Sequence, residues 1–201
     1  SLVKYYYMYL KKRFLLIFVI ILILPYVSSF GGGTGTDVDP YQISTCQELQ
    51  DIDNNRGADY ILINDIDCSE TRTWNNNRGF RPMGYYHSRI LSRCEGFSGT
   101  FDGQGHTISD IYIVYSSEGR VGLFSYTSGA TIKDITFENP RVMGNGHVGC
   151  LVGHADKTNF SNIFVKCSRS SISSAQPSVG GLIGFSYNSS IYNSYSSCNI
   201  G

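Results

Sequence analysis

Two side chains in one short stretch of this sequence could carry acid–base chemistry. Residues 101–108 read FDGQGHTI, which places Asp102 and His106 four residues apart in a glycine-rich segment. A positioned carboxyl group or imidazole can transfer a proton in catalysis, and glycoside hydrolysis uses two carboxyl groups that flank the bond to be cleaved. Asp102 and His106 are therefore the candidates for a catalytic site.

The same stretch has the composition of a tight turn. Asp102-Gly103 and Gln104-Gly105 are dipeptides that mark turns, and no second acid recurs near Asp102 at the same place in a repeat. The remaining histidines are scattered and have no evident partners: His87, His147 and His154. We therefore favour the turn and predict no catalytic residue.

An irregular insertion from Glu70 to Gly96 carries aromatic side chains. Trp74 and the pair Tyr85-Tyr86 lie within it. Such rings stack on sugars, and they serve equally well as packing under a long loop. The sequence leaves both alternatives open.

The elements that would position these residues follow from an internal repeat. The phrases VGLFSYTS, VGCLVGHA and VGGLIGFS begin at Val121, Val148 and Val179. Units of an apolar residue, any residue and Asp or Asn begin at positions 108, 132, 160 and 191, in steps of 24, 28 and 31. The last three units start ten residues after Gly122, Cys150 and Gly181. A fixed offset within a variable step is typical of a solenoid, whose turns take the insertions.

One repeat has the length of one coil of a parallel β-helix, in which side chains alternate between the interior and the exterior. Two columns are expected to stack inward: Leu123, Leu151 and Leu182, and Ile108, Ile132, Phe160 and Ile191. Glycines suit corners where φ is positive or backbones crowd: Gly122, Gly153, Gly181 and Gly184. A ladder of turn residues is expected from short polar side chains: Asp110, Asp134, Asn162 and Asn193.

A known family shares this pattern. The stretch Gly181-Leu182-Ile183-Gly184 resembles the GLUG motif of bacterial and archaeal surface proteins, and residues 43–52, 60–69 and 97–113 resemble the segment that usually precedes GLUG repeats. Cys150 and Ser125 depart from the pattern, since glycine is usual at both places. The resemblance covers residues 42–201. It implies an all-β, right-handed parallel β-helix on the cell exterior, with no established enzymatic chemistry in the repeat.

The N-terminus is predicted to be a targeting segment. Three basic residues precede eleven apolar ones, Phe14 to Leu24, and Ser29 follows at a position suited to cleavage. Residues 1–29 are therefore expected to form a secretory signal peptide. The apolar run is shorter than the ~20 residues of a membrane span. No charge occurs between Phe14 and Thr36, so an uncleaved anchor is the alternative, and it would be the chain's one contact with a membrane.

Residues 30–41 are predicted to be a linker, and residues 42–201 a β-helix domain that is truncated at its C-terminus. Thr45 and Glu48 have the spacing of a capping box. A short helix that includes Leu49 and Ile52 is expected to cover the first coil, because solenoid ends need caps.

Six cysteines in an exported chain predict disulfides. Cys46 and Cys68 flank the expected cap helix and first strand, whereas Cys167 and Cys198 occupy the same place in successive coils, within disulfide reach. Stacked free thiols are the alternative for the second pair. No spacing resembles a zinc site, and neither a metal nor a cofactor is predicted.

Charge and sequons add two expectations. Without the signal segment the chain has twelve basic against 16 acidic residues, a net charge of −4, and it lacks a basic run, so nucleic acid is not an expected partner. Asn159 and Asn188 begin Asn-x-Ser sequons, of which Asn188 is the better acceptor because Asn159 precedes the core residue Phe160.

Together these features favour a non-catalytic exported module, secreted or at the cell surface, with a structural or adhesive role. Its expected partner is a surface protein or a glycan. The alternative is a carbohydrate-active β-helix enzyme, a polysaccharide lyase or a glycosidase, because the stretch FDGQGHTI resembles one that is common in those enzymes.

Overall fold

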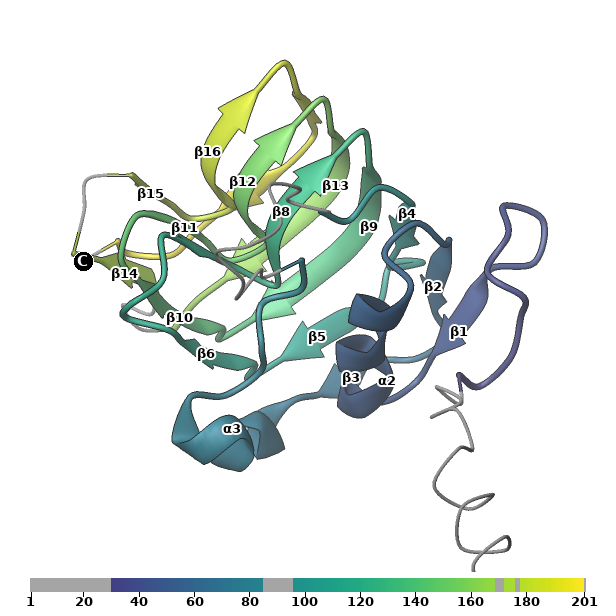
Figure 1. Cartoon of the computed structure of the whole chain (residues 1–201), viewed down its shortest axis with the longest axis horizontal. Coiled ribbons are helices and arrows are strands. Elements are labelled where there is room, and N and C mark those ends of the chain that lie inside the picture. Colours follow the sequence, from purple (N-terminus) through teal and green to yellow (C-terminus); the bar gives the residue numbers. More distant parts are fainter. Residues whose placement is uncertain (1–29, 85–95, 169–171, 176–177, 201) are drawn as a thin grey trace, which may run out of the picture.

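The chain winds into a parallel β-solenoid, which confirms the predicted fold class. The computed structural model describes residues 30–84, 96–168, 172–175 and 178–200. The expected signal segment, its cleavage site at Ser29, and the pair Tyr85-Tyr86 lie outside these residues. Between the named strands every described pairing is parallel. Figure 1 shows equivalent strands of successive coils side by side.

The largest sheet of the described chain follows the order β1-β2-β4-β9-β13-β17, to which β3, β5 and β18 add further pairings. Its strands are β1 (Tyr41–Ile43), β2 (Tyr60–Leu62), β3 (Ile66–Asp67), β4 (Thr100–Asp102), β5 (Thr107–Ser109), β9 (Thr131–Glu138), β13 (Asn159–Lys166), β17 (Ser190–Tyr192) and β18 (Tyr195–Ser196). Within β9 and β13 the chain passes one corner of the coil, at Asp134 and Asn162, which both have a positive φ.

Three smaller sheets complete the coils, each with one strand from each of three coils. The first contains β6 (Tyr112–Val114), β10 (Arg141–Gly144) and β14 (Ile172–Ser174); the second contains β7 (Arg120–Val121), β11 (His147–Gly149) and β15 (Val179–Gly180). The third contains β8 (Phe124–Ser128), β12 (Val152–Asp156) and β16 (Ile183–Tyr187).

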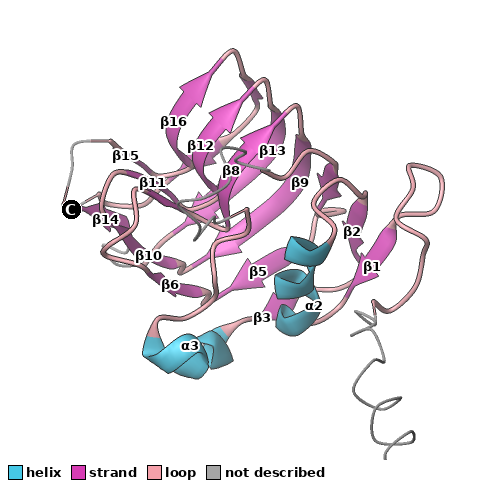
Figure 2. Cartoon of the chain, in the orientation of Figure 1, coloured by secondary structure: helices cyan, strands magenta, loops and turns pink. Residues whose placement is uncertain are grey.

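Short helices occur only in the N-terminal part of the described chain. They are α2 (Cys46–Asp51), the 3₁₀ helices η1 (Ile52–Asn54) and η2 (Ser69–Thr73), and α3 (Trp74–Asn77). Figure 2 shows α2 and α3 beside the N-terminal strands, whereas the later coils consist of strands and loops.

The register of the coils differs from the predicted one at its start. Phe101, Ile132, Phe160 and Ile191 pair in that order, with spacings of 31, 28 and 31 residues. The column expected from Ile108 is therefore wrong, because Ile108 pairs with Phe137 in the second half of β9. Two corners of a coil carry the same pattern, an apolar residue followed two places later by Asp or Asn. The sequence spacing therefore aligned Ile108 with residues of the other corner.

Asp110 is not part of the predicted ladder, for the same reason. Its N–H donates to the carbonyl oxygen of Glu138 at 2.9 Å, which places it beside Asn139. Both residues have a positive φ, 55° for Asp110 and 49° for Asn139. Asp110 is therefore a corner residue, as predicted, but it belongs to a different corner from Asp134.

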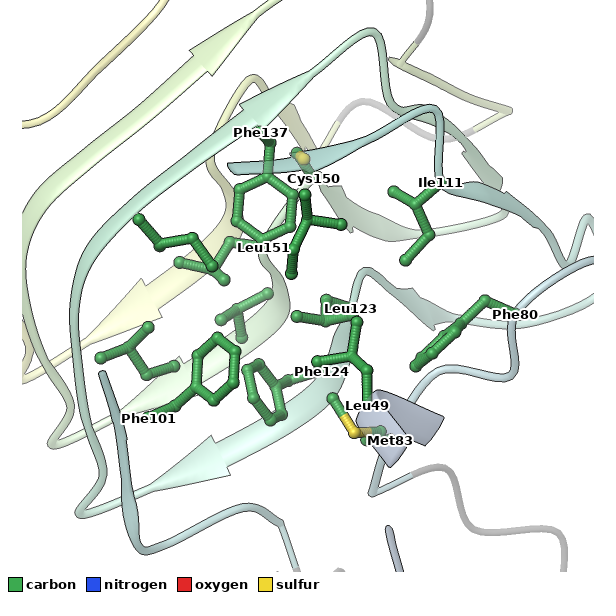
Figure 3. Close-up of a cluster of buried hydrophobic side chains, with 14 of the residues drawn as sticks. Leu49, Phe80, Met83, Phe101, Ile111, Leu123, Phe124, Phe137, Cys150 and Leu151 are labelled. Carbon is green, nitrogen blue, oxygen red and sulfur yellow. The ribbon is translucent and has the colours of Figure 1, made fainter. Parts of the chain in front are cut away.

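The interior is a single cluster of apolar side chains. Leu123 and Leu151 are buried in it, and Figure 3 shows them with Phe101 and Phe124 in the core. Leu182 is aligned with Leu151, whose N–H donates to its carbonyl oxygen at 3.0 Å, and it is partly buried. Ile191 is 51% exposed, since no described residue covers it, so its expected burial is wrong.

The predicted short helix forms at the N-terminal end. Thr45 caps α2: its hydroxyl accepts from the N–H of Glu48 at 3.1 Å, and the Glu48 carboxylate accepts from the N–H of Thr45 at 3.0 Å. Leu49 is fully buried in the core cluster. These contacts bind α2 to the first coil, and its role as a cap that protects that coil stays a prediction.

The segment predicted as a linker contacts the solenoid. Phe30 packs against Tyr41, with ring centroids 4.6 Å apart, and against Tyr60 at 5.4 Å. The N–H of Gly31 donates to the carbonyl oxygen of Gln42 at 3.0 Å. Residues 31–32 thus lie beside β1, residues 34–39 form a turn, and Tyr41 is the first residue of β1.

Candidate functional site

Asp102, the first catalytic candidate, is engaged by its own turn and by the next coil. It ends β4, and its side chain is 8% exposed. One carboxylate oxygen accepts the N–H of Gln104 at 2.8 Å, and the other accepts the Gln104 amide at 2.7 Å. The Lys133 ammonium lies 2.7 Å from that second oxygen. The hydrogen bond that the Lys133 ammonium donates to Asp102 raises the pKa of Lys133. Because Asp102 and Lys133 belong to paired strands, this ion pair joins two coils.

His106 has a different partner. Its Nδ1 lies 3.2 Å from an oxygen of Asp65, which also accepts the N–H of Thr107 at 2.9 Å. The Thr107 and His106 hydrogen bonds lower the pKa of Asp65. The structure therefore gives Asp102 and His106 separate partners and does not join them in one pair.

The ladder residues contact one another from coil to coil. The Asn162 amide donates to the Asp134 carboxylate at 2.6 Å, and the Asn193 amide donates to the Asn162 carbonyl oxygen at 2.7 Å. The three residues have φ values of 56°, 55° and 45°. Short polar side chains tolerate this left-handed conformation better than others do, so the ladder both forms the corner and joins the coils.

The motif glycines lie where the backbones of adjacent strands crowd. A β-carbon on Gly153 would come within 2.6 Å of the Val121 nitrogen, and one on Gly184 within 2.4 Å of the Val148 nitrogen. Both distances are too short for any side chain. These glycines therefore allow the second and third small sheets to fold tightly against each other.

An aromatic cluster that the sequence did not predict lies on the outside of that fold. It contains Tyr126, His147, His154 and Phe185, from three different coils. The His154 ring lies 5.6 Å from His147, 4.7 Å from Phe185 and 5.3 Å from Tyr126. The register explains it, because His154 pairs with Tyr126 and Phe185 in neighbouring strands.

The two imidazoles of this cluster are half-buried. Their Nδ1 atoms are buried and have no hydrogen-bond partner among the described residues. Burial lowers the pKa of His147, and so does the nearby Arg120. Burial, Arg120 and His147 likewise lower the pKa of His154. Both rings therefore favour the neutral form.

A polar groove lies between α2 and α3; we call it the Trp74 groove. It has a volume of about 460 Å³ and is lined by Gln47, Gln50, Asp51, Asn54, Trp74, Asn75 and Arg81. The sequence places Trp74 in an insertion and predicts the short helix, but it does not indicate that the two face each other. Only the fold brings residues 47–54 to the insertion.

Both predicted disulfides are present. Cys46 is bonded to Cys68, and Cys167 to Cys198. Cys150 is a buried free thiol whose pKa is raised by its burial. The first bond ties α2 to the residue that follows β3, and the second ties two successive coils together.

The sequon residues are both exposed. Asn159 begins β13 and accepts a hydrogen bond from the Ser190 hydroxyl at 2.7 Å, whereas Asn188 lies in the turn between β16 and β17. Asn188 as the better glycosylation acceptor stays a prediction.

The described part of the chain contains neither a cluster of metal-binding side chains nor a membrane-spanning helix. No group of three or more His, Cys, Asp or Glu side chains there could hold a metal ion. None of the described helices is both long and apolar enough to cross a bilayer.

Comparisons with known proteins point to the same repeat. The model of the GLUG motif matches residues 175–201. Halomucin from Haloquadratum walsbyi is 35% identical over 160 residues, which are 76% of this chain. A "Putative Gly-rich membrane protein" from Evansella cellulosilytica is 28% identical over 133 residues, 63% of this chain. The matches span only 2% and 14% of these two relatives.

A solved structure shares the fold. It is the chain described as a "putative immunoglobulin A1 protease" from Bacteroides ovatus, which aligns with a TM-score of 0.64 and 18% sequence identity. The alignment covers 85% of this chain and 50% of the other. At this identity the likeness supports the solenoid architecture and nothing about activity.

Proposed function

Because this chain is a GLUG-repeat β-helix protein, we propose that it is a non-catalytic module of an exported protein, with a structural or adhesive role at the cell surface. The main support for the proposal is that the repeated residues contact neighbouring coils. Leu151, Gly153 and Asn162 each contact a neighbouring coil. The repeat therefore builds a stack and leaves its outer side chains for contacts.

The contacts of the Asp102 carboxylate support the absence of catalysis. Its oxygens are engaged by Gln104 and Lys133, and its partner for hydrolysis would have to be a second carboxyl group on the same face. Asp65 pairs with His106 instead. The carboxylate of Asp134, which contacts the same Lys133 ammonium as Asp102, accepts a hydrogen bond from Asn162 and lies 3.6 Å from that ammonium. These contacts favour a turn that is locked to the next coil.

Export is supported by the two disulfides, because such bonds persist in oxidising compartments. Location at the surface is also in line with a relative named as a membrane protein. To test it, the chain is expressed with a C-terminal tag and the tagged product is sequenced from its N-terminus. We expect a mature N-terminus near Phe30 outside the cytoplasm. Intact chain held in the membrane would instead identify residues 1–29 as an anchor, and intact chain in the cytoplasm would contradict export.

A separate experiment tests whether the chain is instead a carbohydrate-active enzyme. The purified chain is incubated with a panel of plant, algal and bacterial polysaccharides, and reducing ends and unsaturated products are measured. We expect neither above the level of a heat-treated sample. Product release by the native chain that Asp102→Asn abolishes would establish a lyase or a glycosidase and overturn the proposal.

A further inference from the structure

We propose that the Trp74 groove binds a neutral saccharide. The inference names a ligand for the adhesive role and rests on that proposed function. The groove has a volume of about 460 Å³, which lies within the ~300–1,000 Å³ of typical small-molecule sites. Its lining combines one aromatic ring with amide, carboxylate and guanidinium groups, the chemistry that recognises a sugar ring and its hydroxyls.

The indole of Trp74 supplies an apolar platform. Trp74 is partly buried, and its ring stacks on the fully buried Phe80 with an interplanar angle of 21°. This packing fixes the indole against the core while part of it still lines the groove. A fixed aromatic ring offers contact area at little cost in conformational entropy, and the C–H face of a sugar is the matching surface.

The rest of the groove is polar. Asn54 is exposed, and its amide makes no hydrogen bond with any described residue. Gln47 donates its amide N–H to one oxygen of Asp51 at 3.1 Å, which leaves the other carboxylate oxygen of Asp51 able to accept. Amide and carboxylate groups satisfy hydroxyls, which both donate and accept. None of the described residues that line the groove has an aliphatic side chain, so a lipid or an apolar peptide segment is a poor match.

The charges around the groove favour a neutral ligand. Arg81 lines it, but its guanidinium lies 3.1 Å from a carboxylate oxygen of Asp53. Arg56 lies 3.8 Å from the other oxygen of the same carboxylate. The cation is therefore already paired, and the carboxylate of Asp51 would repel an acidic sugar.

The groove is held in shape by contacts on both sides. Gln50 donates its amide to the carbonyl oxygen of Arg81 at 3.0 Å and accepts the N–H of Arg81 at 2.7 Å, across 31 residues of sequence. The Asn75 amide donates to the carbonyl oxygen of Gly79 at 2.8 Å. Asn75 has a positive φ of 51°, a backbone conformation that asparagine tolerates better than most residues. A site formed in advance binds without the cost of ordering its walls.

The chain offers a direct reporter, since Trp74 is its only tryptophan. The full chain is titrated with glucose, galactose, mannose, N-acetylglucosamine and their disaccharides while the tryptophan emission is recorded. We expect a saturable change with at least one neutral saccharide and none with glucuronic or galacturonic acid. A flat emission signal for the whole neutral panel, together with no heat of binding by calorimetry, would overturn the proposal.

Variants then assign the binding to the groove. By calorimetry, Trp74→Ala should weaken binding by at least about tenfold, as expected for a tryptophan at the centre of a site. Asn54→Ala, which breaks no hydrogen bond within the described chain, should weaken it severalfold without affecting folding. Tyr192→Ala removes another exposed aromatic ring, 72% exposed on the last described coil, and serves as the matched control with native affinity. Native affinity in Asn54→Ala and Trp74→Ala, or binding of an unglycosylated peptide in place of sugars, would refute the site.

A display assay separates this inference from the function on which it rests. Cells that display the full chain are allowed to settle on the saccharide identified above, immobilised on a surface. Adhesion that persists in Trp74→Ala would keep the adhesive role and refute the groove. Saccharide binding in solution without adhesion of the cells would keep the groove and contradict the adhesive role.

Discussion

At the scale of single residues, the corners of the solenoid depend on side chains that both accept a left-handed backbone and bond to the next coil. Asn162 does both: its φ is 55°, its amide donates to Asp134, and its carbonyl oxygen accepts from Asn193. The sequence predicted these three as a ladder because they follow an apolar residue at a constant offset. The residue type predicts a corner because few side chains fit that backbone, but it does not distinguish between corners, since Asp110 was predicted in the same ladder and lies at another corner.

A comparison of Asn162→Ala with Asn162→Gly should separate the contribution of the left-handed backbone from that of the bonds to the next coils. Alanine loses the ladder bonds and also strains the corner, so we expect it to lower the free energy of unfolding by about 1–3 kcal/mol. Glycine loses the bonds alone, and it should be less destabilising by roughly 1 kcal/mol. Urea unfolding measures both values. Equal losses in the two variants would show that backbone conformation at this corner is unimportant.

The histidine cluster predicts a loss of stability in mild acid. Burial lowers the pKa of His147 and His154, Arg120 lowers both further, and Asp156 acts in the opposite direction on His154. The unfolded chain therefore binds more protons than the folded one below the ordinary histidine pKa of ~6.5. Stability should fall as the pH drops from there towards the folded pKa and level off below it.

The measurement is the melting temperature at about pH 7.5 and about pH 5, on both sides of the ordinary histidine pKa. His147→Gln/His154→Gln should show a smaller difference between the two values than the native chain does. The neutral rings Tyr126 and Phe185 face the same cluster, and they carry no charge in this range. An unchanged difference in the double variant would show that these histidines are as solvated as in the unfolded chain.

At the scale of elements, each coil is stabilised by the coils on its two sides. Strand β12 pairs with β8 on one side and with β16 on the other, and Leu151 just before it is 1% exposed. Leu182 holds the equivalent place before β16 and is only partly buried. The same motif residue thus has a different energetic weight in different coils.

Leu151→Ala and Leu182→Ala form a matched pair for this point. The first variant creates a cavity in the packed core and should cost about 2–5 kcal/mol of unfolding free energy. The second removes a side chain that already contacts water, so it should cost clearly less. Lys157→Ala, an exposed position between β12 and β13, should stay within about 0.5 kcal/mol. A cost for Leu182→Ala as large as that for Leu151→Ala would contradict the exposure of the last described coil.

At the scale of the whole molecule, the sequence predicted the repeated features, the capped helix α2 and the Cys46–Cys68 bond, and it missed contacts between segments that show no shared pattern. The repeat spacing was enough for the solenoid, and for the pairing of Cys167 with Cys198, because equivalent positions of adjacent coils must stack. It failed at Ile108, since two corners of one coil carry the same local pattern. The Trp74 groove and the cluster around His154 were beyond its reach, because each joins residues that only the folded chain brings together.

Pairs of engineered cysteines report the stacking register of the coils. In the structure Ser109 lies beside Glu138 in a parallel ladder, and neighbouring strands are ~4.8 Å apart, within reach of a disulfide. The register read from the sequence spacing would place Ser109 beside Lys133 instead. Each pair is introduced separately, the purified chain is digested without reduction, and linked peptides are identified by mass. Ser109→Cys/Glu138→Cys should form its bond and Ser109→Cys/Lys133→Cys should not. A bond in the second pair only would contradict the observed register of the coils.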